Sequence, residues 1–73
     1  MNSRTHKILS MASQAHMIVN EDEGARYTIS RVDWDEHTIY VVDNMDEYPL
    51  HVNDICLATD KFYRMEPLYP TNF

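Results

Sequence analysis

Carboxylates are the side chains of this sequence with the most evident chemistry, and they concentrate in its middle. From Val32 to Asp60 there is no Lys or Arg, and eight residues are acidic. The other 44 residues hold all six basic residues and four acids, so the formal charge of −6 divides into −8 for the middle and +2 for the rest. Such a one-sided field repels nucleic acid and favours cationic protein surfaces. The acids of the middle are Asp33, Asp35, Glu36, Asp43, Asp46, Glu47, Asp54 and Asp60.

Two interpretations of these acids stay open: solvated turns, and a surface that recognises another protein. Paired carboxylates perform acid–base catalysis only where burial drives their pKa values apart. Most of these acids instead fall among turn-forming residues, so catalysis by them is not expected. The predicted recognition surface consists of the two turns that flank the central strand: Asp33, Trp34, Asp35, Glu36, Asp43, Asp46 and Glu47.

Other catalytic and metal-binding patterns are missing from the sequence. Cys56 is the only cysteine, and its position between Ile55 and Leu57 predicts a buried, inert thiol. Cys56 and the four histidines lack the spacing of zinc ligands, and residues 43–47 lack the calcium-loop pattern. There is no nucleophile elbow, no phosphate-cradling glycine loop and no H-E-x-x-H. We therefore expect no enzyme activity, no metal and no cofactor.

The elements that must position these residues begin with a helix, predicted over residues 5–19. Its apolar residues have helical spacing, Ser3 fits an N-cap, and Gly24 lies in the stop signal where a positive φ is needed. The stripe consists of Ile8, Met11, Ala12, Ala15 and Val19.

A β meander is predicted over residues 26–58, where aromatic and β-branched residues crowd together. The expected order is strand 27–32, turn 33–37, strand 38–42, turn 43–47, strand 48–52, a helical turn at 53–55 and a short strand at 56–58. Pro49 cannot donate to a ladder, so it lies on an edge or precedes the pairing. Residues 59–73 then predict an extended tail. The expected core is Ile8, Met11, Ile29, Ile39, Val41, Leu50, Val52, Ile55 and Leu57.

The order of these strands and turns resembles the small SH3-like barrels of the Tudor and KOW type. The resemblance covers residues 26–58 and depends on hydrophobic rhythm. It implies a three-strand meander, a brief helical turn and a closing strand. Tudor-like domains often bind methylated side chains in an aromatic cage. Trp34, Tyr40 and Tyr48 could supply aromatics, but they do not align to cage positions, so no cage is implied.

The expected fold is therefore one α+β domain, with a helix packed on a strongly bent antiparallel sheet or SH3-like barrel of four or five strands. A core of this size without disulfide or metal is marginal, which favours a homodimer. The surplus of Met and aromatic residues near the C-terminus marks the expected contact for a second copy or a partner. It consists of Phe62, Tyr63, Met65, Leu68 and Tyr69.

The expected function is protein binding without catalysis. Small acidic chains of this kind are typical of phage-type inhibitors or adaptors that engage a basic surface of a host protein, such as one that normally holds nucleic acid. Two other functions stay open: a nucleotide-like ligand site at a homo-oligomer interface, and a structural subunit of a larger assembly. Direct nucleic-acid binding and membrane insertion are not expected. We expect a cytoplasmic location.

Overall fold

The computed structural model describes residues 2–64. Its first element is the helix α1 (Ser3–Gln14), which begins at Asn2, where the side-chain Oδ1 accepts from Thr5 N at 2.7 Å. The N-cap is therefore Asn2 and not Ser3. The predicted helix was also too long, because Ala15 leaves the helix with an extended ψ of 165° and the residues after it join the sheet.

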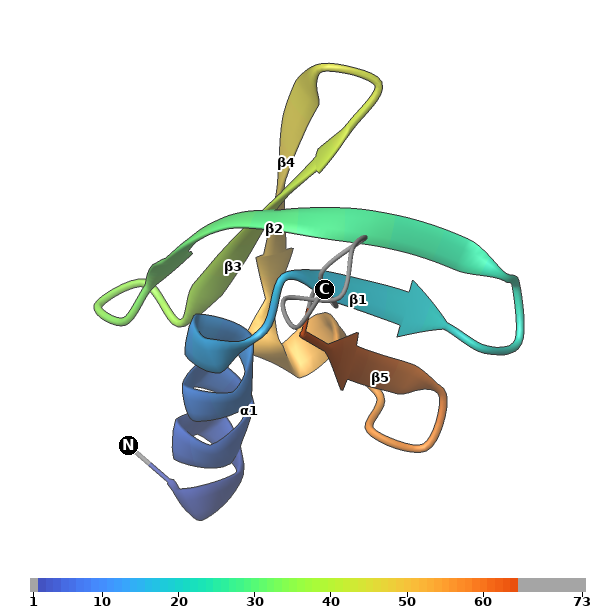
Figure 1. The fold of residues 1–73 in the computed structure, drawn as a ribbon. Helices are drawn as coiled ribbons and strands as arrows, with labels where there is room; N and C mark the ends of the chain where they lie inside the picture. The colour runs from blue at the N-terminus through green and yellow to red at the C-terminus, as the bar shows by residue number, and fades with distance from the viewer. Residues whose placement is uncertain (1, 65–73) are drawn as a thin grey trace, which may run out of the picture.

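Five antiparallel strands form one sheet in the order β4-β3-β2-β1-β5 (Figure 1). They are β1 (Met17–Asn20), β2 (Ala25–Asp33), β3 (Thr38–Asp43), β4 (Asp46–His51) and β5 (Asp60–Tyr63), with the 3-10 turn η1 (Val52–Asp54) before β5. The sheet stays open, with β4 and β5 as its edges, so the α+β class with five strands is confirmed and closure into a barrel is not. None of the helices within residues 2–64 is long and apolar enough to cross a membrane.

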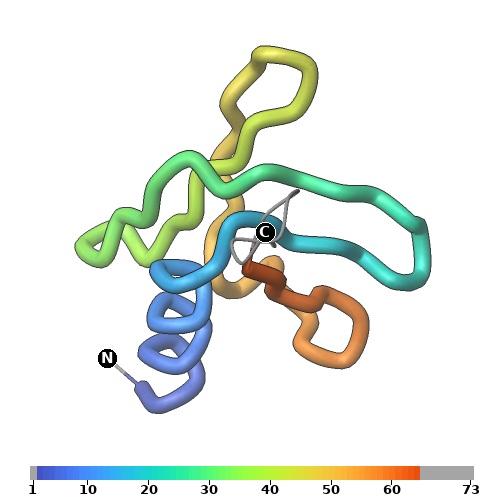
Figure 2. Tube along the Cα trace, in the orientation of Figure 1, coloured from blue at the N-terminus to red at the C-terminus, as the bar shows by residue number. Residues whose placement is uncertain are grey.

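The sheet bends where β2 carries a bulge. Ile29 pairs with Val41 and Arg31 pairs with Tyr40, so Ser30 is the extra residue. A bulge increases the local twist and bends its strand. The β1–β2 and β3–β4 hairpins consequently project in different directions from the body (Figure 2).

The core lies between α1 and the face of the sheet that it covers, here called the inner face. Its fully buried residues are Ile8, Leu9, Ala12, Ile18, Ile39, Val41, Val52 and Ile55. Five of the nine predicted core residues are among them, and three more pack against the core in half-buried positions: Ile29, Leu50 and Leu57. Met11 is only half-buried, and Leu9 and Ile18 were missed.

Arg4 fixes the helix to one part of this face. Its guanidinium donates to the carbonyl oxygens of Val52, at 3.1 Å, and Ile55. Both carbonyls belong to η1 or its C-cap. The start of α1 is therefore held over η1, and the helix packs on β2 and β3 beside it.

The predicted short strand at 56–58 is wrong. Those residues form a turn, in which Asp60 accepts from Cys56 N at 2.9 Å while Asp60 N donates to Cys56 O at 2.7 Å. The fifth strand follows this turn, inside the predicted tail, and pairs with β1. Cys56 itself is exposed and not buried. Residues 65–73 of the predicted tail lie outside the described residues.

Candidate functional site

The predicted recognition surface is divided between opposite ends of the sheet. Successive turns of an antiparallel meander lie at alternate ends of the strands. Asp33, Trp34, Asp35 and Glu36 consequently lie by the β2–β3 turn, while Asp43, Asp46 and Glu47 lie on the β3–β4 hairpin. Phe62 and Tyr63 lie on the β5 edge, and Met65 and Tyr69 lie outside the described residues.

The polar groups of the β2–β3 turn form hydrogen bonds with one another. Asp33 Oδ1 accepts from Glu36 N at 3.0 Å, and Thr38 Oγ1 donates to Glu36 O at 2.9 Å. The Trp34 ring stands edge-on to His6 of α1, with 5.7 Å between the ring centroids. Trp34 therefore connects the turn to the helix and is only 39% exposed. These contacts favour the interpretation of a solvated turn at this end.

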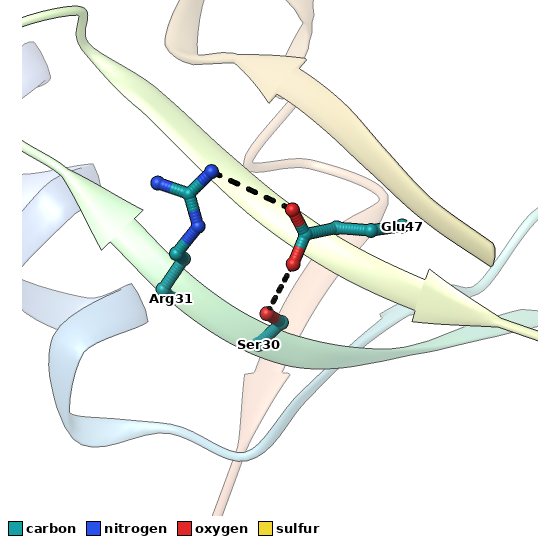
Figure 3. Close-up of polar contacts among 3 residues, drawn as sticks. All are labelled: Ser30, Arg31 and Glu47. Atoms are coloured by element: carbon teal, nitrogen blue, oxygen red, sulfur yellow. Dashed lines mark hydrogen bonds and ion pairs between the residues drawn. The ribbon is translucent and has the colours of Figure 1, made fainter. Parts of the chain in front are cut away.

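Glu47 belongs to a cluster on the outer face of the sheet, away from α1. It accepts from Ser30 Oγ at 2.6 Å and pairs with the Arg31 guanidinium at 3.5 Å (Figure 3). The Arg31 guanidinium carbon also lies 3.8 Å from the centroid of the Tyr40 ring. Because of the bulge, the side chains of Ser30 and Arg31 both reach Glu47. Glu47 lies on the outer face, so it is separated from the acids of the inner face.

Asp43 and Asp46 are direct cross-strand partners at the tip of the β3–β4 hairpin. Asn44 and Met45 between them have φ of 51° and 73°, the left-handed values that a tight two-residue hairpin needs. Met45 is 96% exposed at the tip. Like charges placed directly opposite each other destabilise a hairpin. The tip therefore carries two facing carboxylates, of which Asp46 accepts a long hydrogen bond of 3.5 Å from the Tyr48 hydroxyl.

The inner face beside this hairpin is hollowed. Tyr27, Val41, Tyr48 and Leu50 line a depression of about 320 Å³ with Asp43 at its end. Tyr27 and Leu50 also line an adjacent depression of about 170 Å³, so the two depressions share part of their wall. We call them together the trough. Its floor is Ile18, Tyr27, Val41, Tyr48, Leu50 and Ile55, and its acidic residues are Glu23, Asp43, Asp54 and Asp60.

The electrostatics of the trough have a single sign. No Lys or Arg occurs among the described residues that line it. The carboxylate of Asp46 raises the pKa of the Tyr48 phenol, with smaller contributions from desolvation and from Asp43. Asp60 is engaged within the fold, because it accepts from Asn20 Nδ2 and from Cys56 N, each at 2.9 Å. Glu23, Asp43 and Asp54 are exposed and open to a ligand.

The sequence predicted part of this site. Asp43 belongs to the predicted recognition surface, and Val41, Leu50 and Ile55 of the trough floor belong to the predicted core. Glu23 and Asp54 were not assigned, because their positions in turns carry no sign of which face they border. The open inner face was missed as well, since it depends on where the helix ends.

Outside the trough, we considered the Cys56 thiol as a possible nucleophile and clusters of side chains as possible metal ligands. The backbone N–H of Ala58 and then the Thr59 hydroxyl lower the pKa of the exposed Cys56 thiol, whereas the neighbouring Asp60 carboxylate, which accepts from Cys56 N, acts in the opposite direction. Residues 2–64 contain no group of three His, Cys, Asp or Glu that could hold a metal ion. Comparison with protein-family models, curated proteins and solved structures found no match to this chain.

Proposed function

We propose that this chain is a protein-binding module whose trough accepts a cationic segment of a partner protein. The facing Asp43 and Asp46 carboxylates, beside an apolar and aromatic floor, carry this proposal. A cation between them would relieve their mutual repulsion, and no Lys or Arg of the described residues lines the trough there. The partner is therefore expected to bring Lys or Arg.

The floor of the trough suits the stem of such a side chain. Lys and Arg place their methylene groups along apolar surfaces while the charged head stays near water. Tyr48 is 46% exposed and Tyr27 is half-buried, so both rings are accessible to a methylene stem or to a cation. Aromatic residues and Met are also enriched in protein interfaces, and Met45 is exposed at the same hairpin.

The trough favours a protein segment over a nucleotide-like ligand. A nucleotide needs cations for its phosphates beside the aromatic ring that stacks its base. No Lys or Arg lines the trough among the described residues, and Arg31, which stacks on the half-buried Tyr40 ring and pairs with Glu47, lies on the outer face. An acidic adaptor or inhibitor that covers a basic partner surface is the function that this charge arrangement supports.

Titration of the ¹⁵N-labelled protein with two short acetylated peptides tests the proposal. The peptides share the same alternating Leu and Tyr residues, and one carries Lys and Arg between them where the other carries Glu. We expect the basic peptide alone to shift the amide signals of Tyr27, Val41, Tyr48 and Leu50. Equal binding of both peptides, or shifts confined to the β2–β3 turn, would refute the proposal.

A matched pair of charge reversals locates the site. Asp43→Lys should weaken binding of the basic peptide by about tenfold and mainly slow its association. Asp35→Lys changes the net charge equally but lies at the other end of the sheet, so it should have a much smaller effect. If the two variants bind alike, net charge and not the trough explains the attraction.

A further inference from the structure

The two edges of the sheet differ in their ability to accept another strand. Just beyond the C-terminal end of β4, Val52 N donates to His37 O at 2.9 Å. Backbone groups of alternate residues point to opposite sides, so the nitrogen of Pro49 points away from β3. The proline thereby removes a donor from the outer side of β4, which is a common way to block edge pairing. Its edge position confirms one of the two alternatives that the sequence left open.

The β5 edge has no such block. Tyr63 O accepts from His16 N at 2.8 Å, and Thr59 O accepts from Glu21 N at 2.9 Å, so these carbonyls point toward β1. By the same alternation, the N–H and C=O of Phe62 point outward. Within residues 2–64, Phe62 thus presents one unpaired donor and one unpaired acceptor on the outer side of this four-residue edge strand.

We propose that β5 pairs with the β5 of a second copy, antiparallel and about a two-fold axis at Phe62. Each Phe62 then donates its N–H to the carbonyl oxygen of the partner's Phe62 and accepts the equivalent bond in return. This is the closely spaced pair of an antiparallel ladder. The two five-stranded sheets become one continuous sheet, and each trough adjoins the contact only at Asp60.

Charge selects this register. A two-fold axis at Phe62 places Asp60 opposite the partner's Arg64 and Lys61 opposite the partner's Tyr63. Asp60 also accepts from Asn20 Nδ2 and Cys56 N, and the Lys61 ammonium donates to Leu57 O at 3.1 Å, so both charges are held at this edge of the sheet. Arg64 is exposed and makes no hydrogen bond or ion pair with another described residue. Moving the axis to Lys61 would bring two ammonium groups together, and moving it to Tyr63 would separate Asp60 from Arg64. Opposite charges across a strand pair stabilise it and like charges destabilise it.

Apolar surface next to the edge supports the same contact. A hollow of about 410 Å³ lies between α1 and β5, with Met11, Leu57 and Phe62 among its lining residues. Phe62 is on the inner face with Ile18, its pairing partner on β1. The partner's Phe62 would arrive on that same face and cover part of this hollow. Hydrogen bonds, charge and apolar burial therefore point to the same occupant, a second copy of the chain.

Sedimentation equilibrium of two variants at one exposed position tests the proposal. Tyr63 is 45% exposed, so substitutions there leave the core intact. Tyr63→Lys faces the partner's Lys61 and should raise the dimer dissociation constant by about tenfold, whereas Tyr63→Glu should leave it unchanged or lower it. Net charge alone predicts the reverse order, because Tyr63→Glu makes an acidic protein more acidic. That reverse order, or a monomeric wild type at about 1 mM, would overturn the proposal.

Disulfide formation tests the register independently. In a Cys56→Ser background, Lys61→Cys and Tyr63→Cys are prepared as separate proteins and oxidised singly and as a mixture. Directly opposite residues of a non-hydrogen-bonded pair have Cα atoms about 4.5 Å apart, within disulfide range. We expect the mixture to yield mostly the mixed disulfide. A dimer that forms the two homodisulfides as readily as the mixed one would refute this register.

Discussion

The inner face has a closed half and an open half, although the same strands build both. Ile39 and Val41 are neighbours on β3, and their cross-strand partners on β4 are Leu50 and Tyr48. Ile39 is fully buried under α1, while Tyr48 is 46% exposed in the trough. Strand composition does not explain this difference, because both halves are apolar and aromatic.

The length and anchoring of the helix explain it. A helix of twelve residues is about 18 Å long, and the molecule is 44 Å in its longest dimension. Arg4 holds the helix over η1, and the chain leaves the helix at Ala15 to enter β1. No other α-helix within residues 2–64 covers the rest of the inner face. A structural core and a binding surface can therefore arise from one strand pattern when the covering element is short.

The largest effect is expected in the closed half. Ile39→Ala removes a fully buried side chain from the contact between α1 and β3, so it should lower the free energy of unfolding by about 2–5 kcal/mol. That loss is comparable with the whole stability of a domain of this size. Urea unfolding followed by far-ultraviolet circular dichroism measures it. A loss well under about 1 kcal/mol would show that the helix does not close this half.

A smaller effect is expected one strand away, in the open half. Leu50 pairs directly with Ile39 but is only half-buried at the trough. Leu50→Ala should cost about 1 kcal/mol, because less apolar surface leaves water on folding there. The folded variant should bind the basic peptide more weakly. If Leu50→Ala destabilises the fold as much as Ile39→Ala, the trough is part of the core and the comparison fails.

The sequence predicted the local elements of this fold better than its long-range pairing. Alternation and turn residues located β2, β3 and β4 within two residues at each end, including the edge position of Pro49. The stretch from Met17 to Asn20 fits a helical stripe as well as a strand, and only its pairing with β5 decides between them. Because β1 was assigned to the helix, β5 had no predicted partner and was interpreted as a tail.

The candidate site shows the same limit. Acids next to each other in sequence were expected to share a surface, but the meander sends successive turns to opposite ends. The bulge at Ser30 then places Arg31 on the outer face, where it pairs with Glu47. Such placements depend on the strand register and on one extra residue in a strand. The composition of the middle segment indicates neither of them.

The Arg31–Glu47 pair on the outer face should contribute little to the stability of the closed half or to peptide binding in the open half. The two side chains are 56% and 41% exposed, so solvent and salt screen their attraction. Glu47→Gln should change the free energy of unfolding by less than about 1 kcal/mol. It should also leave binding of the basic peptide nearly unchanged, since Glu47 is absent from the trough. A large loss of peptide binding would show that the binding surface extends around the hairpin to the outer face.

The smallest expected effect is a change in titration that reports directly on the open half. Asp46 raises the pKa of Tyr48 because a phenolate beside that carboxylate is a like charge. Asp46→Asn should therefore move the titration of Tyr48 to lower pH, with no change of fold, as measured by NMR of its ring carbons. Asp35→Asn, at the opposite end of the sheet, is the control and should leave Tyr48 as it is. The basic peptide should lower the Tyr48 pKa in the wild-type protein, because a bound cation offsets the carboxylates. Absence of that response while the peptide is bound would mean that the cation lies elsewhere than between Asp43 and Asp46.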